Sequence, residues 1–308
     1  MIMRLYTGLE RSLETGVWQP EGVPTVYNFI NSASTKYDLT LILTCKDSGK
    51  TYMSGWKEKE DRIFFLTGLP APIVVLAGTS FFGSLLPRKI AMIFRDLRHL
   101  CKIFHFVWFE KPDLIYCDGA NVTFAYCLSK IFPKTPVVLR LLGICSFLRS
   151  LPDARRLVHR IYKLAFRGRF SMAIGTQDGT GTEYFFDRAL NASVPRCVLL
   201  NGTDEAKPFP GLEKTLPFGW LDTASQYKTV LFVGRIEADK GIRIFIDAVL
   251  GVLSSGVNGV RAIIVGSGSL FDEVKQKVDQ SGYEDNFLFT GSVPHAHILG
   301  FHFLSDIY

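Results

Sequence analysis

Two basic side chains, Arg235 and Lys240, lie five positions apart in a short turn between an apolar run and a helical pattern. Gly234 ends the apolar run 230–233, so we expect Arg235 at the carboxyl edge of a parallel sheet, where open α/β folds bind their ligands. We expect Asp239 to cap the following helix, which puts Lys240 in its first turn, where the helix dipole disfavours a cation. A bound diphosphate would remove that conflict, because two cations and the free N–H groups of a helix start would converge on it.

The same turn also fits an ordinary structural role. In that alternative Lys240 is solvated and Arg235 pairs with Glu237 or Asp239, since short basic turns are common in proteins. The local sequence leaves both interpretations open.

A second glycine turn follows the next apolar run. Gly266 and Gly268 in IIVGSGSLFDEV would let the backbone approach a ligand closely where another helix begins. The turn does not complete a dinucleotide-binding fingerprint, because Phe271 occupies the third glycine position and no acidic residue ends the next apolar run, 287–289. An NAD-dependent enzyme is therefore disfavoured, whereas a nucleotide-diphosphate site is not.

Apolar runs alternate with helical patterns along most of the chain, which predicts buried parallel sheets in a doubly wound α/β fold. The predicted strands are residues 39–44, 114–117, 137–141, 172–174, 198–200, 230–233, 262–265 and 287–289. The predicted helices are residues 25–34, 88–109, 122–131, 153–167, 182–190, 242–253 and 270–280. Between residues 205 and 228 the pattern lapses into a stretch bearing Pro and Gly, so we place a boundary there, between domains 1–204 and 205–308.

Composition excludes several classes of protein. Hydrophobic residues make up 47% of the 308 residues and charged residues 21%, which is typical of a folded globular chain. The net charge of +6 suits a phosphate-bearing partner or an anionic membrane surface, and no run of Lys and Arg indicates nucleic acid. The six cysteines form no C-x-x-C pair, and His295, His297 and His302 lack an acidic or Cys companion, so we predict no metal site.

Two segments raise the question of membrane contact. Residues 63–86 are uncharged and long, but Pro70 and Pro72 interrupt them, so a buried strand-turn-strand or interfacial segment fits better than a span. In the helical pattern at 88–109 we expect an apolar stripe to pack on a sheet, with a basic remainder in solvent that could also contact anionic lipid headgroups. The stripe comprises Ile90, Ile93, Phe94, Leu97, Cys101 and Phe104, and the basic remainder comprises Arg88, Lys89, Arg95, Arg98 and Lys102.

Several short motifs occur together in a fixed order. Residues 234–241 (GRIEADKG), 264–268 (IVGSG), 289–293 (FTGSV) and 305–308 (SDIY) resemble the donor domain of retaining GT-B glycosyltransferases, the group called glycosyl transferases group 1. Ahead of the predicted boundary, residues 200–204 (LNGTD) are similar to the N-G-[VI]-D motif of that family. Residues 21–25 (EGVPT) resemble the glycine loop that opens the first helix of its acceptor domain.

The resemblance implies a GT-B fold of two Rossmann-like domains, with a nucleotide-sugar donor in the second and the acceptor in the first. Catalysis in the family usually needs no metal, and we expect no cofactor beyond the donor substrate. Arg235 and Lys240 would hold the donor diphosphate and stabilise the charge that develops on it as the sugar leaves. The donor site would further include Gly234, Gly266, Gly268 and Asn201, and the acceptor side would include Gly22 and Asp118.

The sequence departs from the family pattern at two places. The family often has His after two first-domain strands, where this chain has Asp118 and Leu142, so Asp118 is the candidate acceptor-side polar group. Its structural alternative is a turn residue beside Gly119. A Glu-x7-Glu motif that grips the donor follows the SDIY segment in the family, but this sequence stops at Tyr308, so we expect the second domain to be incomplete.

We therefore expect a glycosyltransferase that moves a sugar, with retention, from a nucleotide-diphosphate sugar to a glycan or lipid-linked acceptor. Surface-polysaccharide biosynthesis at the cytoplasmic face of a membrane would suit the basic helix and the Phe-rich first domain. The alternative is a truncated, non-catalytic remnant or nucleotide-binding module. No residue identifies the sugar, the base or the acceptor.

Overall fold

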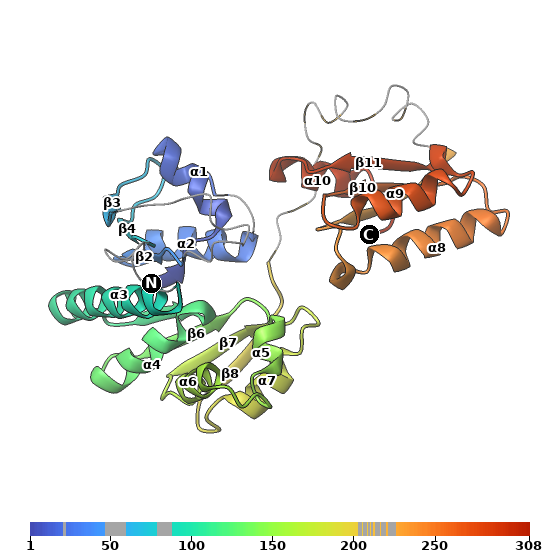
Figure 1. Cartoon of the computed structure of the whole chain (residues 1–308). Helices are drawn as coiled ribbons and strands as arrows, with labels where there is room; N and C mark the ends of the chain where they lie inside the picture. The colour runs from blue at the N-terminus through green and yellow to red at the C-terminus, as the bar shows by residue number, and fades with distance from the viewer. Residues whose placement is uncertain are drawn as a thin grey trace. The chain divides into compact units, whose positions relative to one another are not determined.

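The computed structural model describes residues 1–20, 23–46, 60–78, 88–202 and 226–308, together with residues 205, 208, 210, 212, 216 and 220. The chain divides into two compact units, residues 1–203 (unit 1) and residues 204–308 (unit 2), each with its own sheet (Figure 1).

Unit 1 is built on an eight-stranded sheet in the order β3-β4-β2-β1-β5-β6-β7-β8. All neighbouring strands run parallel except β3 and β4, which form an antiparallel pair. The strands are β1 (Ile2–Arg4), β2 (Leu41–Thr44), β3 (Arg62–Phe64), β4 (Ile73–Leu76), β5 (Ile115–Asp118), β6 (Val137–Leu141), β7 (Met172–Thr176) and β8 (Arg196–Leu199). The helices are α1 (Thr7–Thr15), α2 (Pro24–Lys36), α3 (Arg88–Glu110), α4 (Val122–Ile131), α5 (Ser146–Ser150), α6 (Leu157–Phe166) and α7 (Thr182–Ala189), with a 3₁₀ turn η1 (Gly119–Asn121).

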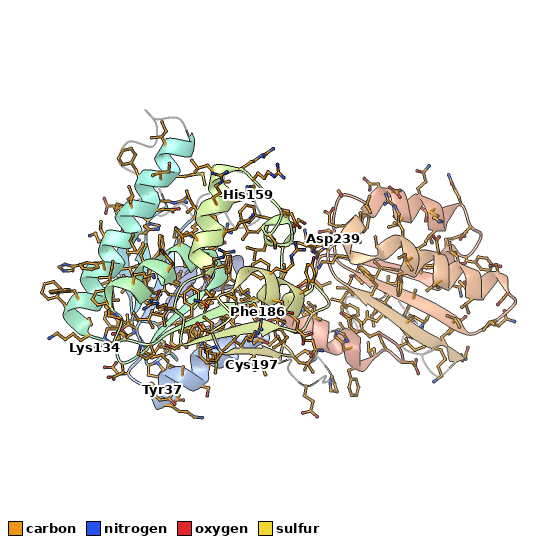
Figure 2. All side chains as sticks on the ribbon, turned by 90° about the horizontal axis from the view of Figure 1, so that it is seen from below. Tyr37, Lys134, His159, Phe186, Cys197 and Asp239 are labelled. Atoms are coloured by element: carbon orange, nitrogen blue, oxygen red, sulfur yellow. The ribbon has the colours of Figure 1, made fainter. Side chains whose placement is uncertain are left out.

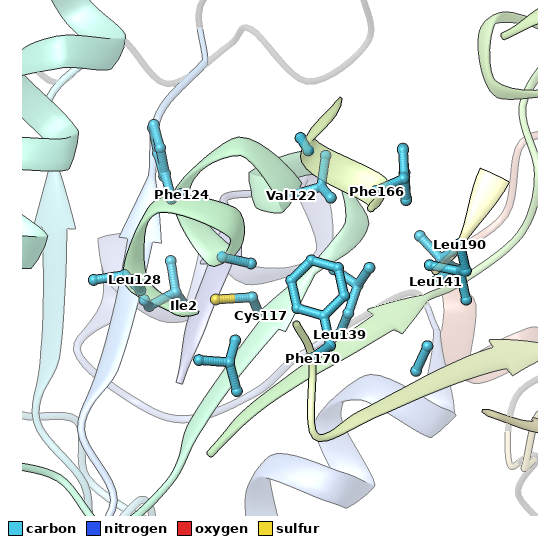
Figure 3. Close-up of a cluster of buried hydrophobic side chains, with 14 of the residues drawn as sticks. Ile2, Cys117, Val122, Phe124, Leu128, Leu139, Leu141, Phe166, Phe170 and Leu190 are labelled. Atoms are coloured by element: carbon cyan, nitrogen blue, oxygen red, sulfur yellow. The ribbon is translucent and has the colours of Figure 1, made fainter. Parts of the chain in front are cut away.

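The sheet of unit 1 has a hydrophobic core on each face. Ile2 of β1 belongs to the larger cluster, which includes residues of α3, α4, α6 and α7, whereas the next residue, Met3, belongs to a cluster with α1 and α2. This alternation follows from the two-residue period of a strand. Figure 3 shows the larger cluster, in which Cys117 lies close to Ile2 and Phe170.

Unit 2 contains a parallel sheet in the order β11-β10-β9. Helices α8 and α9 pack on one face through residues such as Ile246 and Val274, and α10 packs on the other through Phe301, which is fully buried. The elements are β9 (Lys228–Val233), η4 (Ala238–Lys240), α8 (Ile242–Ser254), β10 (Val260–Val265), α9 (Phe271–Asp279), η5 (Glu284–Asn286), β11 (Phe287–Gly291) and α10 (His295–Phe303).

A late segment of the chain closes the outer edge of β9. Ile307 pairs with Val230 as a parallel bridge, and its carbonyl accepts a hydrogen bond from the N–H of Leu231 at 2.8 Å. The carboxylate of Asp306 accepts hydrogen bonds from the N–H of Thr229 at 2.9 Å and from Lys228 Nζ at 2.7 Å. These bonds satisfy backbone groups that an edge strand would otherwise leave open.

The doubly wound α/β prediction is confirmed. The predicted helix at 122–131 and strand at 137–141 match α4 and β6, and the other predicted elements differ from the observed ones only at their ends. Within residues 63–86, the described part is the predicted strand-turn-strand, formed by β3 and β4. The predicted burial is right for β4 but wrong for β3, where Ile63 is 63% exposed. Strand β1 and helices α1, α5 and α10 had not been predicted. No helix among the described residues is both long enough and apolar enough to cross a bilayer.

Helix α3 packs the face opposite to the one that its sequence pattern predicted. Ile93 and Leu97 of the predicted stripe are 59% and 52% exposed, and Ile90, Phe94 and Cys101 are also exposed. The buried face instead carries Arg95, His99, Ile103 and Val107. The polar pair is tolerated there because each side chain is bonded: the Arg95 guanidinium donates to Asp96, and His99 Nε2 lies 2.8 Å from the carbonyl oxygen of Ala77.

His99 should make unit 1 sensitive to acid. Burial lowers the pKa of this fully buried imidazole to about 4, whereas an unfolded His titrates near its ordinary value of about 6.5. At a pH between these two pKa values, the unfolded chain binds a proton at His99 that the folded chain does not bind. The contribution of His99 to the unfolding free energy is therefore fully present above the unfolded pKa and is lost as the pH drops toward 4. We expect native unit 1 to lose about 2 kcal/mol of unfolding free energy between roughly pH 7 and pH 5 through this residue.

Urea unfolding of native protein and of His99→Gln at the two pH values tests this expectation. The variant should be less stable at neutral pH but should show a smaller loss on acidification. The exposed His105→Gln on the same helix is the matched control. An equal loss in native protein and in His99→Gln would contradict the assignment.

Candidate functional site

The loops that follow β9, β10 and β11 are joined at the carboxyl edge of the unit 2 sheet. The N–H of Ile236 donates to the carbonyl of Ser267 at 2.9 Å, and the N–H of Leu270 donates to the carbonyl of Ile236 at 3.1 Å. The hydroxyl oxygens of Ser267 and Ser292 lie 2.7 Å apart. Parallel strands bring successive loops to one edge, which is where α/β folds bind ligands.

Arg235 and Lys240 lie at this edge and share one carboxylate. Arg235 Nη2 is 3.6 Å and Lys240 Nζ is 4.0 Å from Oδ2 of Asp239, which Figure 2 labels. The three side chains are 55%, 48% and 64% exposed, and ion pairs at such exposure contribute little to stability. Both cations are therefore accessible to an anion with more charge than one carboxylate.

The expected placement of Asp239 and Lys240 at the start of the helix is wrong. Both residues lie in the 3₁₀ turn η4, and Gly241 follows in the left-handed conformation, with φ 74°, before α8 begins at Ile242. Glycine adopts this conformation without steric cost, so it separates the basic turn from the helix. Asp239 does not cap α8, and Lys240 precedes the first turn of the helix, so the conflict with the dipole is weaker than the sequence implied.

Glu237 anchors the turn and was not identified as a site residue from the sequence. Its carboxylate accepts hydrogen bonds from the Ser269 hydroxyl at 2.6 Å and from the Ser269 N–H at 3.0 Å. These bonds lower the pKa of Glu237 below its ordinary value. The sequence offered Glu237 and Asp239 as structural partners of Arg235. Arg235 pairs with Asp239, whereas the Glu237 carboxylate is bonded to Ser269. The partners Glu237 and Ser269 are 32 positions apart, so no local pattern could reveal their contact.

Gly266 and Gly268 allow the backbones of two loops to approach each other. A Cβ on Gly266 would lie 1.9 Å from the carbonyl oxygen of Gly234, and a Cβ on Gly268 would lie 2.4 Å from the carbonyl oxygen of Ile236. Gly234 differs, because a Cβ there would meet nothing closer than the Phe232 ring at 3.7 Å. Steric packing thus accounts for Gly266 and Gly268, whereas Gly234 is free of that requirement.

The C-terminal part of the chain matches a known family. Residues 221–308, which include β9 and all three loops, match the family described as glycosyl transferases group 1. A curated relative, the 2-deoxystreptamine N-acetyl-D-glucosaminyltransferase of Streptomyces fradiae, is 29% identical over 203 residues, which cover 60% of this chain. The match spans less than half of that relative, 46% of its length.

Solved structures resemble the chain over nearly its whole length. HepE of Anabaena, in complex with UDP and glucose, gives a TM-score of 0.57 at 18% identity, covering 99% of this chain and 72% of that chain. Sucrose-phosphate synthase of Thermosynechococcus elongatus gives a TM-score of 0.63 at 12% identity, covering 99% of this chain and 73% of that chain. An E. coli structure described as trehalose-6-phosphate bound with UDP-2-fluoro glucose gives a TM-score of 0.64 at 10% identity, covering 99% of this chain and 76% of that chain.

The likeness to these structures shows a GT-B fold, and residues 221–308 match the glycosyl transferases group 1 family. At these identities the structural likeness establishes the fold, and the family match locates the shared sequence in unit 2. The three joined loops therefore lie in the part of this GT-B chain that carries the family pattern.

The other residues predicted for the site lie in unit 1 or outside the described residues. Asn201 follows β8, and its Oδ1 accepts a hydrogen bond from the Thr176 hydroxyl at 3.3 Å. The next residue, Gly202, accepts a hydrogen bond from the Thr25 hydroxyl at 3.2 Å. Gly22 lies outside the described residues. Among the described residues, no group of three or more His, Cys, Asp or Glu side chains is placed to hold a metal ion.

Asp118 ends β5 and is hydrogen-bonded to neighbouring backbone and side-chain groups. Its Oδ2 accepts from the N–H of Arg4 at 2.7 Å, and its Oδ1 accepts from the N–H and Nδ2 of Asn121 at 3.1 and 2.7 Å. Burial raises the pKa of Asp118, and these hydrogen bonds and the nearby Lys46 oppose the rise. The carboxylate thus ties the end of β1 to the turn after β5, which is a structural role beside its proposed acceptor-side one.

Gly266→Ala should destabilise unit 2. The added methyl would collide with the Gly234 carbonyl, and φ at Gly266 is 138°, so we expect a loss of about 1–3 kcal/mol. Chemical unfolding followed by far-UV circular dichroism measures the loss. Gly234→Ala is the matched control in the facing loop and should stay within about 1 kcal/mol of native protein. Equal midpoints for native protein and Gly266→Ala would show that the loops separate without cost.

Proposed function

We propose that this chain transfers a sugar, with retention of configuration, from a nucleotide-diphosphate sugar to a glycan or lipid-linked acceptor in surface-polysaccharide biosynthesis. The observation that carries the proposal is the pair of accessible cations, Arg235 and Lys240, on the joined loops of the family-matched unit. Unit 2 holds the donor and unit 1 holds the acceptor. The donor is a substrate, and no separate cofactor is proposed.

The chemistry follows from charge. A diphosphate carries two or more negative charges and several acceptor oxygens, so it displaces Asp239 as the partner of both cations. The N–H groups at the start of α8, which begins two residues after Lys240, add partial positive charge. When the bond between sugar and phosphate breaks, negative charge accumulates on the leaving diphosphate, and fixed cations stabilise it.

The neighbouring structures support a nucleotide sugar as the donor. HepE of Anabaena was solved with UDP and with UDP-glucose, and the E. coli structure with UDP-2-fluoro glucose. Departing phosphate oxygens can accept the acceptor proton in a retaining mechanism, so the proposal requires no protein general base.

UDP or GDP should stabilise the native chain. At about 100 times the dissociation constant the gain is about 2.7 kcal/mol, which raises the melting temperature by several degrees. Arg235→Ala with Lys240→Ala should abolish the rise. Lys275→Ala with Lys277→Ala removes the same charge from α9 and should preserve it, because both lysines pair with carboxylates away from the joined loops. An unchanged rise in the Arg235 and Lys240 variant would overturn the site assignment.

Transfer itself is tested by incubation with nucleotide sugars and NMR of the released or transferred sugar. The proposal expects nucleotide release that depends on Arg235 and Lys240, and a product with the anomeric configuration of the donor. Binding of nucleotide without any turnover would instead support the alternative of a nucleotide-binding module.

We also propose that unit 1 contacts an anionic membrane surface, and α6 supports this. Its exposed positions include Leu157, Val158, Ile161 and Leu164, between 47% and 73% exposed, and the helix contains no acidic residue. Arg155, Arg156 and Arg160 are exposed and form no ion pair with another described residue. Exposed apolar side chains beside unpaired cations favour the interface of an anionic bilayer.

Helix α3 extends this surface. Its exposed stripe of Ile90, Ile93, Phe94 and Leu97 belongs to the half of the helix that contains Arg95 and Asp96. Tyr162 of α6 is close enough to both charges for them to affect its pKa, which burial raises. Part of α3 therefore lies near α6, the helix in which Figure 2 labels His159.

Binding to lipid vesicles tests this surface without any donor. Native protein should sediment with phosphatidylcholine vesicles containing about one-third phosphatidylglycerol, and less so at high salt or without the anionic lipid. Leu157→Asn with Ile161→Asn, and separately Arg156→Gln with Arg160→Gln, should reduce binding at least about tenfold. Val252→Asn with Val257→Asn, and Lys275→Gln with Lys277→Gln, are the matched controls in unit 2. Equal binding by all variants, or a dimer broken by Leu157→Asn with Ile161→Asn, would overturn the membrane assignment.

A further inference from the structure

A pocket of about 190 Å³ lies between α2 and the sheet in unit 1. Thr25 and Phe29 of α2 line one side, Tyr116 and Arg140 of the sheet line the other, and the remaining lining is largely apolar. The rings of Phe29 and Tyr116 stack with centroids 4.8 Å apart. A mostly apolar hollow with a few polar groups is the usual form of a small-molecule site.

Arg140 is the unusual member of this lining. The residue is 6% exposed, yet its guanidinium makes a single hydrogen bond with another described residue, from Nη2 to the Thr176 hydroxyl at 3.2 Å. A guanidinium has five N–H donors and stays charged at any physiological pH, so four donors have no acceptor among the described residues. A buried cation without a bonded anion is costly to the fold, which points to a ligand that supplies the anion.

The nearest carboxylate does not fill that role. Asp118 is the register neighbour of Arg140 across β5 and β6, and both line the pocket. However, the two oxygens of Asp118 already accept from Arg4 and twice from Asn121, and the carboxylate forms no ion pair with Arg140 within 4 Å. Three N–H donors therefore hold the carboxylate toward β1 and the turn after β5.

We propose that this pocket binds an acidic sugar, one that bears a carboxylate or a phosphate group, with Arg140 pairing to the anionic group. The planar guanidinium suits two-pronged pairing with either oxyanion, and the apolar and aromatic lining suits the less polar face of a sugar ring. The inference rests on the proposed function in one respect: it assigns the acidic sugar to the acceptor. Sugar acids and sugar phosphates are the two sources of the anion.

Binding of single sugars to the full chain tests the pocket. Glucuronate and glucose 6-phosphate are the probes, glucose is the neutral comparison, and saturation-transfer NMR or calorimetry is the readout. The background carries Arg235→Ala with Lys240→Ala, so that phosphate cannot bind at the proposed donor site. At least one acidic sugar should bind about tenfold or more tightly than glucose, and the tighter of the two identifies the source of the anion.

Two variants separate binding from folding. Arg140→Met keeps much of the shape but removes the charge, and it should abolish the preference for acidic sugars. Phe29→Glu changes a residue that is 42% exposed and adds a negative charge to the pocket wall, so it should weaken acidic sugars about tenfold. The loss of stacking on Tyr116 should lower the melting temperature by only a few degrees. Tyr37→Glu adds the same charge at the far end of α2, where Tyr37 is 72% exposed, and should leave binding unchanged.

Unchanged binding in Phe29→Glu, or glucose binding as tightly as both acidic sugars, would overturn the proposal even if Arg140→Met failed to fold. Sulfate binding as tightly as both sugars would also overturn it, because the pocket would then recognise an ion alone. The donor test is independent, since it reads UDP or GDP in unit 2. Nucleotide stabilisation without acidic-sugar binding removes this inference alone, and the reverse result removes the proposed donor site alone.

Discussion

The hydrogen bonds between the loops after β9 and β10 hold the candidate donor edge together. They require two backbones to approach so closely that neither Gly266 nor Gly268 can bear a side chain. Glu237 adds a second connection through Ser269, and the two bonds to its carboxylate fix the turn from which Arg235 projects. The cations themselves stay exposed and weakly paired, so a rigid base presents them with little reorganisation, which is the condition for electrostatic stabilisation of a leaving group.

In unit 1, the hydrogen bonds of buried polar groups decide which side chains are buried. Asp118 and His99 are buried, and each is bonded to a backbone group of a neighbouring segment. These hydrogen bonds offset the free-energy cost of burying the two polar side chains. On α3 this arrangement turns Arg95 and His99 inward and leaves Ile93 and Leu97 in solvent. The apolar surface of unit 1 is therefore a consequence of polar bonding at the sheet edge. Arg140 differs from these two, since the described residues give its guanidinium a single hydrogen bond.

Much of the fold could be predicted from the sequence, because apolar runs in parallel strands and helical periods are local patterns. The type of element was correct at α4, β6 and α8, and the order of motifs indicated the GT-B fold. Strand β1 was missed because three residues give no recognisable period, and α10 because its apolar residues form no stripe on one side of the helix. The face of α3 could not be predicted, because it depends on Ala77 and Asp96 accepting hydrogen bonds.

The site was predictable only in part, for the same reason. Arg235 and Lys240 could be found from their spacing, since a strand, a turn and a helix follow one another directly in the chain. Glu237 and Arg140 could not. Glu237 depends on Ser269, 32 positions away, and Arg140 stands out only because the described residues give its guanidinium a single hydrogen bond. The capping role expected for Asp239 failed at one residue, Gly241, whose left-handed conformation ends the 3₁₀ turn before the helix starts.

The closure of β9 by Asp306 and Ile307 also sets an order of assembly during synthesis. The bonded groups are separated by 77 and 78 residues, so β9 leaves the ribosome long before the segment that covers its edge. Until then the nascent strand presents unpaired N–H and C=O groups that can pair with another chain. Unit 1 precedes it and can already be folded at that stage, whereas the edge of β9 stays open until residues 306 and 307 have been made. The period in which the nascent chain can pair wrongly therefore falls in the synthesis of unit 2.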